Sequence, residues 1–196
     1  IIGYIVRNQY GGDDNNAQVK HGIKQFLARE AKFPCLLVVP QCPKNVWWSG
    51  NRRSQTATAE EKGPDTMSLV IELLESLQKE LPVDPKRLYV TGLSMGGYGT
   101  WDLLLRKPAM FAAGIPVCGG GDVSKASVIA KIPQWVHHGD KDTAVNVEQS
   151  RKMVAAMKAA GGEPKYTEYP GVGHNSWDNA YADDAVYEWL FAQKQP

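Results

Sequence analysis

A Gly-x-Ser-x-Gly motif at residues 92–96 holds the side chain best suited to nucleophilic chemistry, Ser94. A serine hydroxyl is a weak nucleophile, so a fold that uses one must expose it on a sharp turn and hold a base beside it. The motif follows an apolar, strand-like run and precedes a helix-like pattern, and Gly92 and Gly96 allow strand and helix to approach closely. The pattern predicts that Ser94 is a nucleophile, with an ordinary glycine-rich turn as the alternative.

The base that activates this serine must be a histidine, because imidazole can take a proton and return it near neutral pH. The sequence has four histidines. His21, in or beside an early helix, and His137, inside a strand, are expected to be structural, and Gly139 places His138 in a tight turn. His174 stands on a glycine-rich loop after the last predicted strand and is the predicted base.

A carboxylate must hold that histidine in one tautomer and stabilise its charged form. Two aspartates compete for this role in the segment His-Gly-Asp-Lys-Asp. Asp142 lies deeper in the loop and is the predicted partner of His174, whereas Asp140 is expected to bond backbone N–H groups of the turn. Three later aspartates are expected in the first turn of the last helix, where the helix dipole favours negative charge: Asp178, Asp183 and Asp184.

The oxyanion that forms when Ser94 attacks a carbonyl needs hydrogen-bond donors. One donor is expected from the backbone N–H of Met95, directly after the nucleophile, and a second from the loop after the first strand. That loop offers Arg7, Asn8 and Gln9, and Asn8 is taken as the candidate.

The elements that position these residues alternate between strands and helices. Apolar runs predict strands at residues 1–6, 36–39, 87–90, 111–118, 134–138 and 165–169. Apolar residues at helical spacing predict helices at 17–30, 64–81, 147–160 and 178–193, and between Ser94 and Pro108. The alternation predicts an α/β fold with a doubly wound, mainly parallel sheet and helices on both faces. Ligands bind beyond the carboxyl ends of such strands, where Ser94, Asp142 and His174 fall.

The composition bounds the class of protein. The 196 residues suffice for a single domain, residues 1–196, with a sizeable core. The 22 Lys and Arg are interleaved with 21 Asp and Glu, which argues against nucleic acid or an anionic membrane as a partner. The longest apolar runs have strand length, so no membrane span is expected, and no signal-peptide pattern opens the chain.

The three cysteines predict neither a metal centre nor a redox motif. They form no Cys-x-x-Cys pair and have no histidine cluster beside them in the sequence. Cys35 is expected to be a small buried side chain in a strand. Cys42 and Cys118 each follow a predicted strand, so they could pair as a disulfide if the compartment is oxidising.

Residues 86–189 resemble the small, cap-less α/β-hydrolase esterases that are described as predicted peptidases or phospholipase/carboxylesterase-like proteins and are related to feruloyl and polyhydroxyalkanoate esterases. Four segments carry the resemblance: GLSMGGYGTWD at 92–102, PVCGGGD at 116–122, HGDKD at 138–142 and PGVGHNSW at 170–177. Residues 39–43 and the pair Trp47-Trp48 extend it upstream. The joint pattern is far more specific than any single segment.

The resemblance implies an α/β-hydrolase fold without a lid domain, in which Ser94, Asp142 and His174 are catalytic and no metal or organic cofactor is needed. It implies substrate contacts for three rim residues: Gln41, Trp48 and Trp177. The expected activity is that of a serine carboxylesterase that cleaves short-chain or aryl esters, of the acetyl or feruloyl type, through an acyl-enzyme. A serine peptidase and a non-catalytic binding module are the alternatives.

The chain departs from these relatives near its start. They usually carry His-Gly-x-Gly after the first core strand, where this chain has Val6-Arg7-Asn8-Gln9, and one or two antiparallel strands before it, which this chain is expected to lack. The same resemblance implies a small-molecule or polysaccharide-linked ester as substrate and an extracellular location. It also implies that the domain can be fused to others.

Overall fold

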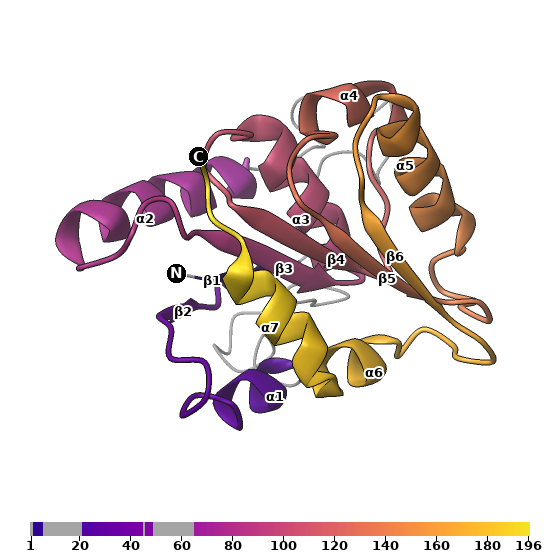
Figure 1. Ribbon diagram of the computed structural model, residues 1–196, viewed down its shortest axis with the longest axis horizontal. Helices are drawn as coiled ribbons and strands as arrows, with labels where there is room; N and C mark the ends of the chain where they lie inside the picture. The colour runs from indigo at the N-terminus through magenta and orange to yellow at the C-terminus, as the bar shows by residue number, and fades with distance from the viewer. Residues whose placement is uncertain (1, 6–20, 45, 49–64) are drawn as a thin grey trace.

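Six parallel strands form one sheet in the part of the chain that the computed structural model describes, residues 2–5, 21–44, 46–48 and 65–196. Their order is β2-β1-β3-β4-β5-β6 (Figure 1). The strands are β1 (Ile2–Ile5), β2 (Leu37–Val38), β3 (Tyr89–Leu93), β4 (Ala113–Val117), β5 (Trp135–Gly139) and β6 (Lys165–Tyr169). The chain adds β2 on one side of β1 and the later strands on the other, which confirms the predicted doubly wound, parallel sheet.

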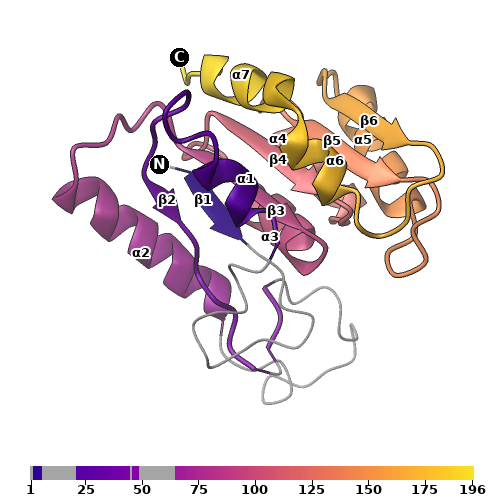
Figure 2. The same ribbon diagram turned by 90° about the horizontal axis from the view of Figure 1, so that it is seen from below.

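Helices cover both faces of this sheet. One face carries α2 (Thr66–Glu80), α3 (Met95–Arg106), α4 (Ala126–Ile129) and α5 (Glu148–Ala159), which pack in one hydrophobic cluster. The other face carries α1 (Ile23–Leu27), α6 (Trp177–Ala182) and α7 (Asp184–Ala192), which pack in a second cluster. Figure 2 shows these three helices in front of the sheet. Within the described residues, no helix has the length and apolar character needed to cross a membrane.

The central strands are buried on both sides, as expected for a parallel sheet between two helical layers. Every residue of β3, β4 and β5 is buried, whereas the edge strand β6 is partly exposed. Along β3, Val90 packs with the α2–α5 layer, and Tyr89 and Leu93 pack with the α1, α6 and α7 layer. The strand that leads to the serine turn is therefore fixed from both faces.

The helix that the sequence predicts over residues 64–81 is found as α2. Asp65 caps its first turn, because the carboxylate accepts a hydrogen bond from the Ser68 backbone N–H at 3.3 Å. Its buried residues recur at helical spacing: Thr66, Met67, Val70, Ile71 and Leu74. The helix ends where Pro82 follows Leu81, in agreement with the prediction.

Several elements differ from the sequence-based expectation. The predicted last helix is divided into α6 and α7 at Asp183, whose extended backbone allows its carboxylate to cap α7 through the Ala185 N–H at 2.9 Å. A 3₁₀ turn, η3 (Val123–Lys125), and α4 lie in a stretch for which no helix is predicted. The second strand is reduced to Leu37–Val38, and the described part of the first predicted helix forms only α1.

The cysteine predictions are corrected by the fold. Cys35 is exposed, because β2 begins two residues later, so its expected burial in a strand is wrong. Cys42 and Cys118 are both buried, but they belong to hydrophobic clusters on opposite faces of the sheet and form no disulfide. The Cys42 thiol lies 3.2 Å from the Val46 carbonyl oxygen, and burial raises its pKa to about 12.

Candidate active site

The sharp turn between β3 and α3 holds Ser94 in an unusual backbone conformation. Its φ is +55° and its ψ −116°, a region that residues with a side chain rarely adopt. The Ser94 N–H donates to the Val117 carbonyl of β4 at 2.9 Å, which fixes the turn against the neighbouring strand. Backbone strain of this kind persists only where the surroundings enforce it, and it is concentrated at functional sites.

The close approach that this turn requires occurs at Gly97 and Gly119. A Cβ on Gly97 would lie 2.5 Å from the Val117 carbonyl oxygen, and a Cβ on Gly119 would lie 2.6 Å from the backbone of Gly97. Glycine is therefore required at both positions for α3 to pack on the end of β4. The sequence predicts a close approach at the motif glycines, Gly92 and Gly96, and gives no signal for this pair.

Ser94 and His174 are brought together by the fold. The Nε2 atom of His174 lies 2.8 Å from the Ser94 Oγ, although 80 residues separate them. His174 stands on the loop between β6 and α6, beyond the carboxyl end of its strand. This geometry lets the imidazole receive the hydroxyl proton directly.

Asp142 holds the other side of the His174 ring. Its Oδ2 lies 2.7 Å from the His174 Nδ1, and its Oδ1 accepts hydrogen bonds from the backbone N–H groups of Ala144 and Val145, both at 2.8 Å. Because the carboxylate only accepts, the proton of the neutral imidazole is on Nδ1, and the Nε2 lone pair faces Ser94. The three predicted residues thus form one hydrogen-bonded chain.

The charge of Asp142 is stabilised despite its burial. Burial alone would raise the pKa of the carboxyl group, since the side chain is fully shielded from solvent. Hydrogen bonds from His138 and His174, and from the Val145 backbone, outweigh this effect and hold the pKa of Asp142 well below its usual value. Asp142 is therefore an anion throughout the neutral range and can stabilise a positive charge on His174.

The loops that carry Asp142 and His174 are tied to each other. The Asp140 carboxylate accepts a hydrogen bond from the Gly171 N–H at 2.7 Å, and the Lys141 N–H donates to the Val172 carbonyl at 3.0 Å. A Cβ on Gly139 would lie 2.2 Å from that same carbonyl oxygen. Asp140 thus bonds a backbone N–H group, as the sequence analysis expects.

The predicted substrate-contacting residues occupy different environments. Trp177 begins α6 and is buried, and its ring meets the His174 ring edge-on with centroids 5.4 Å apart. Trp48 is 2% exposed and packs in the hydrophobic cluster of the α2–α5 layer, whereas Gln41 is half-buried on the segment after β2. The structure therefore places Trp177 against His174, the base of the Ser94–His174–Asp142 set. Substrate contact by the three residues stays a prediction.

The predicted oxyanion donors lie partly outside the described residues. Met95 is the first residue of α3, so no carbonyl one turn earlier can accept from its N–H. This N–H lies beside Ser94, at the positive end of the helix dipole. Arg7, Asn8 and Gln9 fall outside the part of the chain that the structure describes.

The remaining histidines have separate surroundings. His21 is exposed and precedes α1, with its ring 5.5 Å from that of Trp177. His137 is buried between the rings of Trp135 and Tyr169, and burial lowers its pKa to about 3. His138 is fully buried behind Asp142, a contact that the sequence analysis misses.

One group of metal-ligating side chains occurs among the described residues. Atoms of Cys118, Asp142 and His174 lie within 4.8 Å of one another. Zinc accepts ligands of these types. However, the Asp142 Oδ2 and the His174 Nδ1 already bond each other. An ion bound by these atoms would have to displace the contact that orients the imidazole. The arrangement suits proton transfer better than a metal centre.

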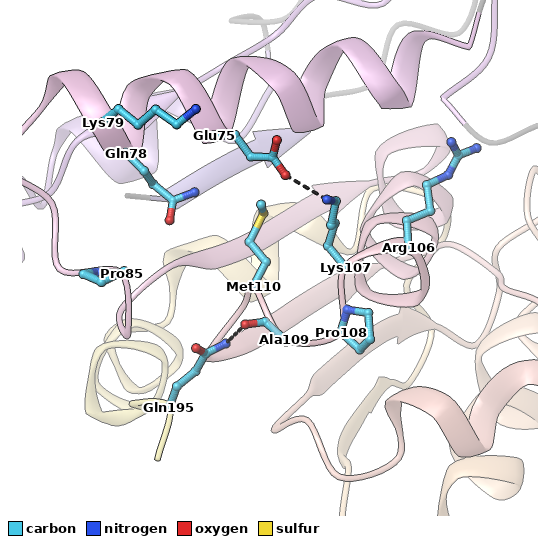
Figure 3. Close-up of a pocket in the computed structure, with 10 residues that line it drawn as sticks. All are labelled: Glu75, Gln78, Lys79, Pro85, Arg106, Lys107, Pro108, Ala109, Met110 and Gln195. Carbon is cyan, nitrogen blue, oxygen red and sulfur yellow. Dashed lines mark hydrogen bonds and ion pairs between the residues drawn. The ribbon is translucent and has the colours of Figure 1, made fainter.

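A surface cavity of about 630 Å³ lies near the amino ends of β3 and β4. Figure 3 shows the residues that line it. Its lining includes Pro85 and Met110, which precede β3 and β4, whereas Ser94 follows β3. An ion pair between Lys107 and Glu75, at 2.7 Å, bridges α2 and the end of α3 within it. The cavity is therefore separate from the hydrogen-bonded chain.

Comparison with known proteins decides the family. A family model described as phospholipase/carboxylesterase matches residues 34–186, which contain Ser94, Asp142 and His174. The chain belongs to the phospholipase/carboxylesterase family. It therefore carries an esterase-type domain with the α/β-hydrolase fold, in agreement with the resemblance found from the sequence.

Several esterases are similar to this phospholipase/carboxylesterase domain. A bifunctional acetylxylan esterase/xylanase of Neocallimastix patriciarum is 31% identical over 94 residues, which cover 47% of this chain and 14% of that protein. The crystal structure of a thermostable esterase matches with a TM-score of 0.90 and 37% identity, over 99% of this chain and 54% of the other. A ferulic acid esterase, with a TM-score of 0.66 and 19% identity over 96% of this chain and 82% of its own, shares the fold.

This domain matches only part of the length of two of these proteins. The domain spans only 14% of the bifunctional acetylxylan esterase/xylanase and 54% of the thermostable esterase. Both similar proteins are therefore longer than the matched region.

Proposed function

We propose that this domain is a serine carboxylesterase that hydrolyses accessible short-chain or aryl esters through an acyl-enzyme. One observation carries the proposal: Ser94, His174 and Asp142 form an unbroken hydrogen-bonded chain, with contacts of 2.8 and 2.7 Å, at the carboxyl edge of the sheet. Membership in the phospholipase/carboxylesterase family supports an ester as the bond that is cleaved.

In the proposed reaction, acyl transfer begins at Ser94. The Ser94 Oγ attacks the ester carbonyl carbon while its proton passes to the His174 Nε2, and Asp142 stabilises the resulting imidazolium. The Met95 N–H, in the first turn of α3, is the proposed donor to the oxyanion of the tetrahedral intermediate. Collapse of this intermediate breaks the ester C–O bond, and His174 returns the proton to the departing alcohol.

The second half of the reaction repeats these roles with water. His174 takes a proton from a water molecule, whose oxygen attacks the acyl carbon bound to Ser94. The acid leaves when His174 returns the proton to the Ser94 Oγ, which restores the free enzyme. No residue outside the hydrogen-bonded chain and its oxyanion donors is needed for the covalent chemistry.

Acetyl and feruloyl esters are the substrates to test first. Two similar proteins, an acetylxylan esterase/xylanase and a ferulic acid esterase, support this choice by their names. A small-molecule or polysaccharide-linked ester as substrate, and an extracellular location, stay predictions from the sequence. The absence of a nucleic-acid or membrane partner also stays a prediction, supported by the balanced charge of 22 basic and 21 acidic residues.

Hydrolysis of p-nitrophenyl acetate and methyl ferulate tests the proposal. We expect turnover by the wild type and almost none by Ser94→Ala, because no other group replaces the nucleophile. Ser127→Ala is the matched control, since Ser127 is exposed on α4 and should leave the rate unchanged. Equal rates for wild type and Ser94→Ala would refute the nucleophile assignment.

Two further measurements separate the alternatives. A fluorophosphonate probe should label Ser94 in the wild type, and failure to label it would favour a non-catalytic binding module. Cleavage of a peptide panel at rates above those for esters would favour a serine peptidase, which needs stronger protonation of an amine leaving group.

A further inference from the structure

A second histidine lies directly behind Asp142. His138 is at the end of β5, and its side chain is completely buried. Its Nε2 lies 2.9 Å from the Val145 carbonyl oxygen and 3.2 Å from the Asp142 Oδ2. Carbonyl and carboxylate oxygens only accept hydrogen bonds, so the Nε2 atom must carry a proton. The ring therefore holds an N–H group, hydrogen-bonded to the Val145 carbonyl, within 3.2 Å of the Asp142 carboxylate.

The opposite side of the His138 ring is held by α5. Its Nδ1 lies 2.7 Å from the hydroxyl oxygen of Ser150, which is also buried and lies 3.3 Å from the Gly119 carbonyl oxygen. Ser150 is thereby tied both to the ring and to the backbone after β4. Two fixed partners, Val145 and Ser150, therefore hold the ring in one orientation.

His138 completes the set of donors around the carboxylate. The Asp142 Oδ1 accepts from the backbone N–H groups of Ala144 and Val145, its Oδ2 accepts from His174, and the His138 Nε2 lies 3.2 Å from the same Oδ2. A carboxylate offers about four lone-pair positions, so three hydrogen bonds and the His138 contact surround it on every side. The carboxylate cannot rotate without losing a hydrogen bond in a buried site, where an unmade bond is costly.

We propose that His138 is a positioning residue for the reaction: it locks the Asp142 carboxylate toward His174 and limits how strongly that carboxylate stabilises the imidazolium. This inference rests on the proposed function, because His138 acts through Asp142 and touches no reacting atom. Competition between two imidazole N–H groups for the same oxygen weakens the hold of Asp142 on the charged form of His174.

Several other ionisable groups of the described residues lie near this pair. His174 and Cys118 face Asp142 from the ends of β6 and β4. Glu168 lies opposite His138 on β6, and its charge is matched by Arg151 of α5 at 2.6 Å. The adjacent His137 is neutral, since burial lowers its pKa to about 3. The direct charged contact of the His138 N–H is therefore with Asp142.

Two substitutions at this position separate the two contacts of the ring. The amide nitrogen of His138→Gln can reach the place of Nε2 and keep a donor toward Asp142. The shorter His138→Asn reaches only the place of Nδ1, toward Ser150. We expect the acid limb of the kcat/KM profile to move up by about one pH unit in the Asn variant, because the imidazolium of His174 is more strongly stabilised. We expect kcat to fall about 10-fold with KM little changed, and the Gln variant to stay near the wild type.

A neighbouring variant controls for general damage to the core. His137→Phe alters a buried histidine on the same strand that bonds Tyr169 at 2.9 Å and not Asp142. It should lower the melting temperature without moving the acid limb. Equal pH profiles for the wild type and the Asn variant, or equal shifts for the Asn and Gln variants, would overturn the proposal.

The proposal can be tested even if the domain is not an esterase. In a Ser94→Ala background, NMR titration of the His174 ring signals follows its protonation without any turnover. The titration midpoint should rise with His138→Asn and return with His138→Gln. If the midpoint does not move, the positioning role of His138 is wrong, whatever activity the wild type shows; if it moves in a protein without esterase activity, only the proposed function fails.

Discussion

The Nδ1 of His174 meets the Oδ2 of Asp142 at 2.7 Å, although 32 residues separate them in the chain. The contact forms because β5 and β6 are adjacent and parallel, so the loops that follow them leave the sheet at the same edge. The serine turn after β3 opens at that edge as well. The three side chains meet because the loops that carry them leave the sheet at the same end.

Loss of the Asp142 charge should reduce turnover severely. In Asp142→Asn the amide can present a donor to His174 and favour the wrong tautomer, so we expect kcat to fall about 10³- to 10⁴-fold. Asp140→Asn is the matched control, because Asp140 bonds the Gly171 N–H and not the imidazole, and it should cost far less. Comparable losses for both variants in p-nitrophenyl acetate hydrolysis would argue against the orienting role.

The strained backbone at Ser94 predicts a gain in stability when its side chain is removed entirely. Glycine tolerates the φ of +55° and ψ of −116°, whereas alanine does not. Ser94→Gly should therefore be more stable than Ser94→Ala by about 1 to 3 kcal/mol. Both variants lack the nucleophile, so urea denaturation compares them without a difference in activity. A Gly variant no more stable than the Ala variant would show that the turn is not strained.

A single methyl group at Gly97 should disturb the packing of α3 on β4. The new Cβ would lie 2.5 Å from the Val117 carbonyl oxygen, so the helix must shift and the serine turn with it. We expect Gly97→Ala to cost about 1 to 3 kcal/mol and to reduce esterase activity. For Gly173→Ala the nearest atom is 3.9 Å away, so this variant should be close to neutral in thermal melts.

The stability of the protein should depend on Glu168 at acid pH. Hydrogen bonds from Arg151, and then from Tyr166, lower the pKa of Glu168 to about 2. A depressed folded-state pKa means that the contribution is present above the unfolded value of about 4.3 and is lost as pH falls through about 2. Urea midpoints of Glu168→Gln should therefore converge on those of the wild type in this window.

The size of this pH effect is expected to be modest, since the ion pair with Arg151 is largely open to solvent. Glu163→Gln, an exposed substitution on the turn before β6, serves as the control. If the difference in urea midpoint between the wild type and Glu168→Gln stays constant from neutral pH down to about 2, the shift is wrongly assigned to Glu168.

Much of the fold was accessible from local patterns in the sequence. The strand at Lys165–Tyr169 and the helix at Thr66–Glu80 lie within the predicted ranges, because alternating or helical spacing of apolar residues encodes burial directly. Ser94, Asp142 and His174 could be singled out because each follows a strand. Their catalytic roles stay predictions until the variants are measured.

The features that escaped prediction depend on three-dimensional packing. The division of the last helix at Asp183 depends on a side chain that caps α7, a choice that helical spacing alone does not show. Cys42 and Cys118 follow strands at the same rim, yet they face opposite sides of the sheet, a distinction that needs the register of each strand. The contact of His138 with Asp142 depends on the path of the loop between β5 and α5, which has no periodic signal.

The close contact of Gly139 with the Val172 carbonyl has a consequence for recombination between related genes. The loops after β5 and β6 fit each other only if position 139 lacks a side chain and Asp140 can reach the Gly171 N–H. A crossover between residues 139 and 172 would join halves that had not been selected together. Chimeric enzymes built from this domain should therefore take the loop with Asp142 and the loop with His174 from the same parent.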